Sequence, residues 1–97
     1  MDYKIPPSWS PTKDQKKLIE MLAKKPGRYF PTEEIMPWVF AESISTDAPA
    51  PAKLRVLVQR SRAFLSERTD NQVSIGIKRN KGYRITKSHV RKLREMS

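Results

Sequence analysis

The chain has 97 residues, enough for a single domain with a small core, and 37% of them are hydrophobic while 31% are charged. The absence of cysteine excludes disulfides and cysteine-ligated zinc, and a lone histidine, His89, argues against a histidine metal centre, so we expect no cofactor. The net charge is +10, and all of the excess lies in residues 53–97, where thirteen residues are basic and three are acidic. This asymmetry favours a polyanionic partner, nucleic acid before a membrane surface.

A proline-rich arm and a first helix are expected at the N-terminus. Residues 1–11 carry three prolines around Trp9 and should be extended, with the tryptophan packed against the domain. Residues 12–25 should form a helix that begins with a capping box of Thr12 and Gln15 and ends at a Pro-Gly pair. Its apolar face consists of Leu18, Ile19 and Leu22.

A second helix should begin with Thr32 as its N-cap, followed by two glutamates that favour the first turn. Pro37 falls at the fifth helical position, where it removes a hydrogen bond, so we expect a distorted first turn. Residues 41–52 are small, polar and proline-containing, and they should form a loop.

Residues 53–65 predict a third helix with two distinct faces. At 100° per residue, the apolar side chains gather on one side, with Ser61 as the only polar residue among them. The other face carries Lys53, Arg55, Val56, Gln59, Arg60, Arg62 and Ala63.

A hairpin and a short helix should complete the fold. Residues 73–77 alternate so that Val73, Ile75 and Ile77 share one face, which is typical of a strand, and residues 83–86 form the return strand. The tip between them, 78–82, is basic and contains Asn80 and a glycine, which suit a tight turn. Residues 88–97 should be a basic tail or short helix.

The basic face of 53–65 has the chemistry of a DNA-reading helix. It contains no acidic residue that could neutralise its cations, and it mixes arginines with Gln59 and Val56. Arginine reads guanine, glutamine reads adenine and a methyl-bearing side chain contacts thymine. An amphipathic helix of this kind can also be merely solvated, and the basic tip can also serve to protect a sheet edge.

Three strings in order resemble the OmpR/PhoB-type winged-helix DNA-binding domain of bacterial response regulators. They are PGRYFPTEEIMPWVF, KLRVLVQRSRAFL and IGIKRNKGYRI, and the resemblance covers about Leu18 to Ile85. It implies an α+β winged helix-turn-helix, with three helices followed by a β-hairpin wing. The recognition helix at 53–65 would enter the major groove and the wing at 78–82 the minor groove.

The resemblance also assigns roles to the residues that match positions of the family's motifs. The resemblance implies that Arg60 points at bases, that Arg62 contacts phosphate and that Arg79 enters the minor groove. Phe40 stands where the family has a tryptophan near the backbone. The whole expected DNA-binding set is Lys53, Arg55, Val56, Gln59, Arg60, Arg62, Lys78, Arg79, Asn80, Lys81, Tyr83 and Arg84.

Several residues depart from the family pattern. Arg55 replaces an aspartate and reverses the charge there, and Asn80 replaces a glycine of the wing. Ser61 replaces a core leucine, and we expect its hydroxyl to bond the Leu57 carbonyl. We therefore do not expect this domain to share the family's base preference.

The expected function is that of a small bacterial or phage transcriptional regulator that binds specific double-stranded DNA, as a monomer or as a tandem or dimer on DNA. The expected organisation is an arm over 1–11, a stand-alone winged-helix domain over 12–87 and a tail over 88–97, with no receiver domain. No signal peptide or membrane span is evident, so we expect a cytoplasmic, nucleoid-associated protein.

Three alternatives to specific DNA binding stay open. The first is a protein-interaction module that binds RNA polymerase or another regulator through 41–52. The second is a non-specific nucleoid-type DNA binder. The third, RNA binding, is weaker because the aromatic residues are mostly committed to core or strands. Catalysis is not expected, because Glu33 and Glu34 diverge by about 100° and His89 has no nucleophile beside it.

Overall fold

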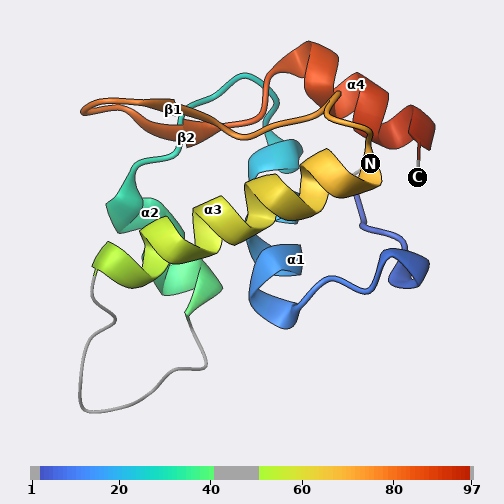
Figure 1. Ribbon diagram of the computed structural model, residues 1–97. Helices are drawn as coiled ribbons and strands as arrows, with labels where there is room; N and C mark the ends of the chain where they lie inside the picture. Colours follow the sequence, from blue (N-terminus) through green and yellow to red (C-terminus); the bar gives the residue numbers. More distant parts are fainter. Residues whose placement is uncertain (1–2, 41–50, 97) are drawn as a thin grey trace.

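The computed structural model describes residues 3–40 and 51–96, which form helices and one hairpin (Figure 1). In chain order these are a 3-10 helix η1 (Pro7–Trp9), α1 (Lys13–Lys24), α2 (Thr32–Val39), α3 (Pro51–Arg68), β1 (Gly76–Lys78), β2 (Gly82–Arg84) and α4 (Lys87–Met96). The two strands pair antiparallel in a two-stranded sheet. Three helices followed by a β-hairpin wing confirm the expected α+β winged helix-turn-helix, and the expected C-terminal helix is present.

The capping box of α1 is formed as predicted. The Gln15 amide donates to Thr12 Oγ1 at 3.2 Å, and the Thr12 amide donates to Gln15 Oε1 at 3.0 Å. Each bond satisfies an amide that has no partner within the helix. The apolar residues of α1, extended by Ala23, are fully buried in the core.

The start of α2 corrects one expectation. Pro31, and not Thr32, is the N-cap residue, because its carbonyl accepts the first helical bonds from Glu34 at 3.0 Å and Ile35 at 3.1 Å. The extended conformation of Pro31 leads the chain into the helix, and no side chain caps it. Pro37 is therefore the sixth helical residue, in the second turn, and the helix continues through it to Val39.

Helix α3 is longer at both ends than the expected 53–65. It includes Pro51 and Ala52, which were assigned to the loop, while residues 41–50 of that loop lie outside the described part of the chain. At its C-terminal end, the buried Thr69 hydroxyl donates to the Leu65 carbonyl at 2.6 Å and accepts the Val73 amide at 3.1 Å. Thr69 thus ties the end of α3 to the segment that leads into the hairpin.

The hairpin is shorter than expected, and Ile77 in its first strand is exposed. Val73 and Ile75 are buried ahead of β1, whereas Ile77 is 64% exposed. The hairpin projects past the helices in Figure 1, and Ile77 belongs to β1, which pairs only with β2 among the described residues. Its partner Tyr83 lies on the inner strand, which is also bonded to Phe30.

Gly82 lets the hairpin approach the chain before α2. It has a φ of +109°, and a Cβ built on it would lie 1.9 Å from the Phe30 carbonyl oxygen. The amides of Phe30 and Tyr83 donate to each other's carbonyls at 2.8 and 3.0 Å. Only glycine fits at this crossing.

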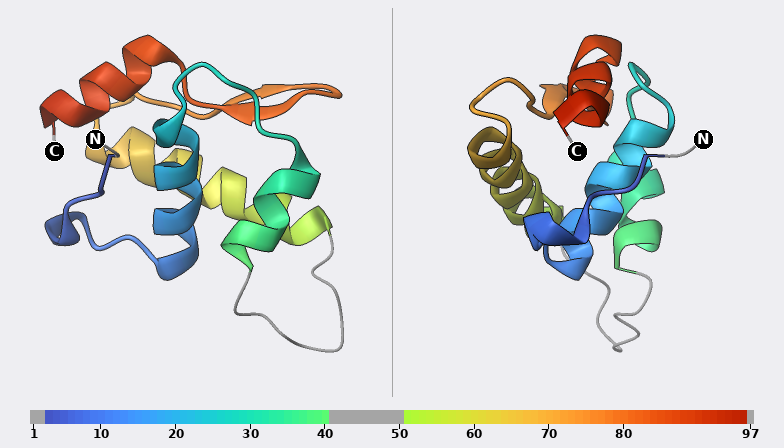
Figure 2. Two further views of the ribbon diagram at one scale, coloured as in Figure 1. Left: turned by 180° about the vertical axis from the view of Figure 1, so that it is seen from behind. Right: turned by 90° about the vertical axis from the view of Figure 1, so that its right-hand side faces the viewer.

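The core joins the ends of the chain to the three central helices. Tyr3 and Ile5 from the arm and Val90 and Leu93 from α4 are buried in the same cluster as the central helices. Trp9 packs the arm against α3 as expected, with its ring centroid 6.3 Å from that of Phe64. Figure 2 places α3 on one side of the α1–α2 pair, with the hairpin and α4 along the top.

Ser61 is buried in this core, and its hydroxyl departs from expectation. The side chain has no exposed surface, and Oγ has no hydrogen-bond partner among the described residues. The expected bond to the Leu57 carbonyl is therefore not formed.

Candidate nucleic-acid interface

The outward face of α3 is basic and fully separated from the core. Its members are Lys53, Arg55, Val56, Gln59, Arg60, Arg62 and Ala63, and all of them are exposed. The face opposite them is the apolar one, so the predicted division of this helix is confirmed. Residues 52–66 contain no acidic side chain. Long cationic side chains therefore project from this face without a neutralising partner in their own helix.

One side of the outward face of α3 meets the wing, the hairpin tip at 78–82. Arg55 lines a groove together with Ile77 and the wing residues, and the start of α2 closes the groove at Pro31, Thr32 and Glu33. The groove thus brings one cation of α3 beside the three cations of the wing. Its only acidic residue is Glu33, which is exposed in the first turn of α2.

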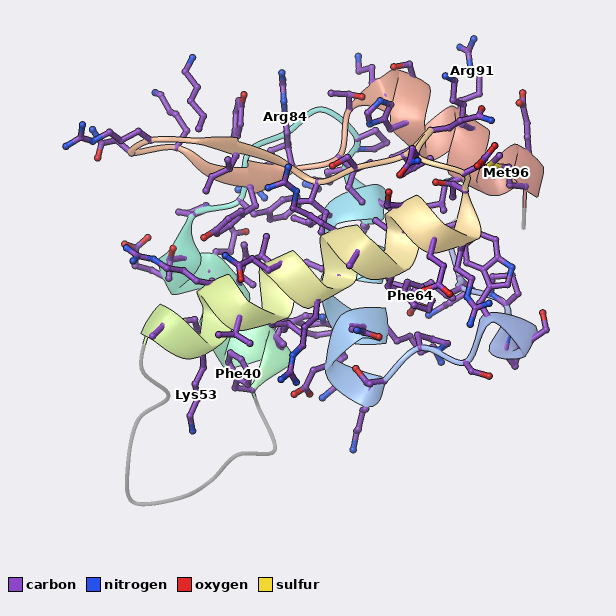
Figure 3. The ribbon with its side chains drawn as sticks, viewed as in Figure 1. Phe40, Lys53, Phe64, Arg84, Arg91 and Met96 are labelled. Carbon is purple, nitrogen blue, oxygen red and sulfur yellow. The ribbon has the colours of Figure 1, made fainter. Side chains whose placement is uncertain are left out.

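The other side of the outward face borders the start of α1. Lys53, Val56 and Arg60 line a second groove with Phe40 of the α2 end and with Thr12, Asp14 and Gln15. Lys53 and Phe40 lie close together in Figure 3, at the lower end of α3. Arg60 is therefore not beside the wing, and Arg62 lines neither groove. The predicted residues form one continuous helix face but not a single pocket.

The wing presents its cations on a tight turn. The Lys81 amide donates to the Lys78 carbonyl at 3.0 Å, and Asn80 adopts a left-handed φ of 65°, a conformation that asparagine tolerates. Lys78, Arg79, Asn80 and Lys81 are all exposed. The turn therefore directs polar and basic side chains away from the domain.

Most of these cationic side chains have no partner in the part of the chain that the structure describes. Among the described residues, no side-chain hydrogen bond or ion pair involves Lys53, Arg55, Arg60, Arg62, Arg79 or Lys81. Unpaired guanidinium groups can bind phosphate oxygens or base edges bidentately, and unpaired ammonium groups can bind phosphates. The surface is suited to a polyanion.

Two predicted site residues stand apart from this exposed set. Tyr83 is only 7% exposed and packs in the core, but it also lines the groove between Arg55 and the wing, so it stays a predicted site residue with little exposed surface. The cause is its place on the inner strand, bonded to Phe30 on one side and to β1 on the other. Arg84 is half-buried and donates to the Gly27 carbonyl at 3.3 Å.

Tyr29 is a positioning residue that the sequence reasoning missed. The Arg84 guanidinium lies 4.4 Å from the centroid of the Tyr29 ring, and Lys78 Nζ lies 5.9 Å from it. Cations over an aromatic face are attracted by its quadrupole, so Tyr29 orders two basic side chains of the hairpin. No sequence pattern indicated this role, since it arises from the pairing of Phe30 with the distant Tyr83.

Comparison with protein families identifies the fold and its role. The family described as "Transcriptional regulatory protein, C terminal" matches residues 8–85. No curated protein and no solved structure matches the chain. Among the described residues, no helix is long and apolar enough to cross a membrane. The matched segment runs from the arm through all three central helices and the hairpin, and this chain therefore belongs to the OmpR/PhoB-type family of DNA-binding domains of transcriptional regulators.

Proposed function

We propose that this domain binds specific sequences of double-stranded DNA, with α3 in the major groove and the wing in the adjacent minor groove. The observation that carries the proposal is the outward face of α3, which combines four unneutralised cations with Gln59 and the exposed Val56. An α-helix fits the major groove of B-DNA, and these side-chain types recognise the base edges displayed there.

Positions along α3 suggest a division of roles. Val56 and Gln59 lie near the middle of the outward face, where contact with bases is favoured, and Val56 can touch a thymine methyl. Arg60 lies one turn further along and is assigned to a base. Arg62 lies at the edge of the face and is assigned to a phosphate, which fixes orientation but carries no base information.

The wing extends the proposed DNA-binding surface of α3 toward the adjacent minor groove of the duplex. The groove that joins Arg55 to the wing supports a continuous contact, because Glu33 is the only acidic residue among those that line it. Arg79 at the tip is assigned to the minor groove, which is narrowest and most negative in A·T-rich DNA. Lys78 and Lys81 are assigned to the flanking phosphates.

Salt dependence provides the first test. If six cations of residues 53–97 meet phosphates, log K against log salt has a slope of about −5 for a duplex. A slope shallower than about −2, measured by fluorescence anisotropy, would contradict the assignment of this surface to DNA. Competition with single-stranded RNA separates the RNA alternative, because RNA should displace the duplex poorly.

Paired substitutions on α3 test the division of roles. Arg60→Ala should cost about 1–3 kcal/mol on the preferred site and relax specificity at one position. Arg62→Ala should weaken binding to all duplexes alike. Equal losses on specific and random duplexes for both variants would show that Arg60 does not read a base.

A further inference from the structure

Helix α4 adds a basic surface outside the segment that matches the family. It follows residue 85, where the match ends, and it buries Val90 and Leu93 in the core. Lys87 and Arg91 are spaced four residues apart, so they lie on the same side of the helix, and both are exposed. They line a shallow groove against Pro26, the turn that follows α1.

A chain of contacts links this side of α4 to the wing. Lys78 and Arg84 both lie over the Tyr29 ring, and Arg84 donates to the Gly27 carbonyl. Gly27 in turn borders Lys87, since a Cβ at Gly27 would lie 3.6 Å from Lys87 Cγ. We call Lys78, Tyr29, Arg84, Lys87 and Arg91 the wing–α4 stripe.

The charge of the wing–α4 stripe is unbalanced in a way that stability does not explain. The first turn of α4 has no acidic residue, and Lys87 is its first residue. A cation at this position opposes the positive end of the helix dipole, where an acidic residue would stabilise the helix. Glu95, the only acidic residue of α4, lies four residues after Arg91 and lines the same groove, in the last turn of the helix. The stripe still sets four cations, Lys78, Arg84, Lys87 and Arg91, against this one carboxylate at its far end, which suits a surface that binds an anion.

The wing–α4 stripe faces a different direction from the outward face of α3. In Figure 3, Arg84 and Arg91 both point away from α3, on the side of the molecule occupied by the hairpin and α4. The two right-angle views agree that α3 and α4 lie on separate sides (Figures 1 and 2). A straight duplex held by α3 and the wing would pass the stripe without following it.

We propose that the wing–α4 stripe binds phosphates of the DNA flank that continues past the wing, so that the duplex curves toward α4. Lys78 belongs to both the wing and the stripe, so the two surfaces are continuous and a strand held at the wing is led onto α4. Phosphate contacts of this kind carry no base code. The binding free energy that they contribute depends on how readily the flanking DNA bends. This inference rests on the proposed binding of α3 and the wing to duplex DNA.

The test compares two duplexes that share one core site. The short duplex ends just past the minor groove next to the wing, and the long duplex continues for about one more helical turn on that side. The double variant Lys87→Ala/Arg91→Ala is compared with Lys24→Ala/Lys92→Ala, which removes the same charge. Lys92 lies on another side of α4, and Lys24 lines a groove at the arm and α2. Dyes at the two ends of the long duplex report its curvature by energy transfer.

We expect the wild type and the control variant to bind the long duplex more tightly than the short one and to shorten its end-to-end distance. The Lys87→Ala/Arg91→Ala variant should bind both duplexes equally and leave the long one straight. On the long duplex, the loss of two phosphate contacts should make the slope of log K against log salt shallower by about 1.8. The ratio of the wild-type affinity to the variant affinity should therefore change about 12-fold between 50 and 200 mM salt.

Three outcomes would overturn the inference. They are an unchanged length effect in Lys87→Ala/Arg91→Ala, an equal loss in the control variant, and capture of a second duplex by the stripe without curvature of the first. The short duplex separates this inference from the proposed function. If the wild type shows no preference for the core site on the short duplex, the assignment of α3 fails, whatever the stripe does.

Discussion

Replacing Gly82 by alanine should destabilise the fold strongly, because the hairpin crosses the chain before α2 at this residue. The new Cβ would lie 1.9 Å from the Phe30 carbonyl oxygen, 2.6 Å from the Phe30 carbonyl carbon and 2.9 Å from Pro31 Cα. All three atoms belong to the backbone, so no side-chain rotation relieves the contact. The φ of +109° at Gly82 is also unfavourable for alanine.

The size of the effect follows from these two costs. A non-glycine residue in a sparsely populated conformation costs about 1–3 kcal/mol. Moving the backbone apart breaks the two bonds between Phe30 and Tyr83, each worth about 0.5–1.5 kcal/mol. Together the loss is roughly 2–6 kcal/mol, a large part of the 5–15 kcal/mol that ordinarily holds a domain folded.

Gly76→Ala is the matched control, because it makes the same chemical change in the same hairpin. A Cβ at Gly76 would meet its nearest atom, the Arg84 carbonyl oxygen, at 3.6 Å, which is an ordinary contact. Urea unfolding followed by tryptophan fluorescence should give Gly76→Ala a midpoint at or above the wild type and Gly82→Ala one far below it. Equal midpoints for the two variants would refute the reasoning.

Three further predictions concern single side chains. Ser61→Ala should stabilise the domain by about 1 kcal/mol and raise its Tm by about 4–8 °C, because it removes a buried hydroxyl that has no partner among the described residues. A lower Tm in calorimetry would mean that the hydroxyl is bonded. Thr69→Val should cost about 1–3 kcal/mol in urea unfolding, since it leaves the buried Val73 amide unpaired; an unchanged midpoint would contradict this. Arg79→Ala should abolish the wild type's preference for A·T-rich over G·C-rich flanks in binding assays, and a wild type without such a preference would refute the minor-groove assignment.

The division of α3 into two faces could be predicted because it depends only on helical periodicity. Every residue placed on the outward face is exposed, and Leu54, Leu57, Val58, Ser61 and Leu65 are buried as expected. The ends of the helix were less predictable. Pro51 suits a first turn as well as a loop, and Ser66 continues a helix as readily as it ends one.

The hairpin was predicted less well, because its burial depends on what lies above and below each strand. Alternation placed Ile77 on one face with Val73 and Ile75, but it could not show that Ile77 is exposed while the other two are buried. The burial of Tyr83 was not predicted either, because it follows from the pairing of this residue with the distant Phe30. Tyr29 was not predicted to order Arg84, because that contact requires the tertiary fold.

Selection of binding sites from a random pool of duplexes tests the central claim most directly, namely that the outward face of α3 reads DNA sequence. The wild type should enrich one short motif. Gln59→Ala, which changes an exposed side chain and no internal contact, should enrich the same motif with preference lost at one position. Lys24→Ala, which lies away from α3, should enrich the wild-type motif unchanged. Enrichment of no motif by the wild type, or of an identical motif by Gln59→Ala, would contradict the assignment of α3 as the reading helix.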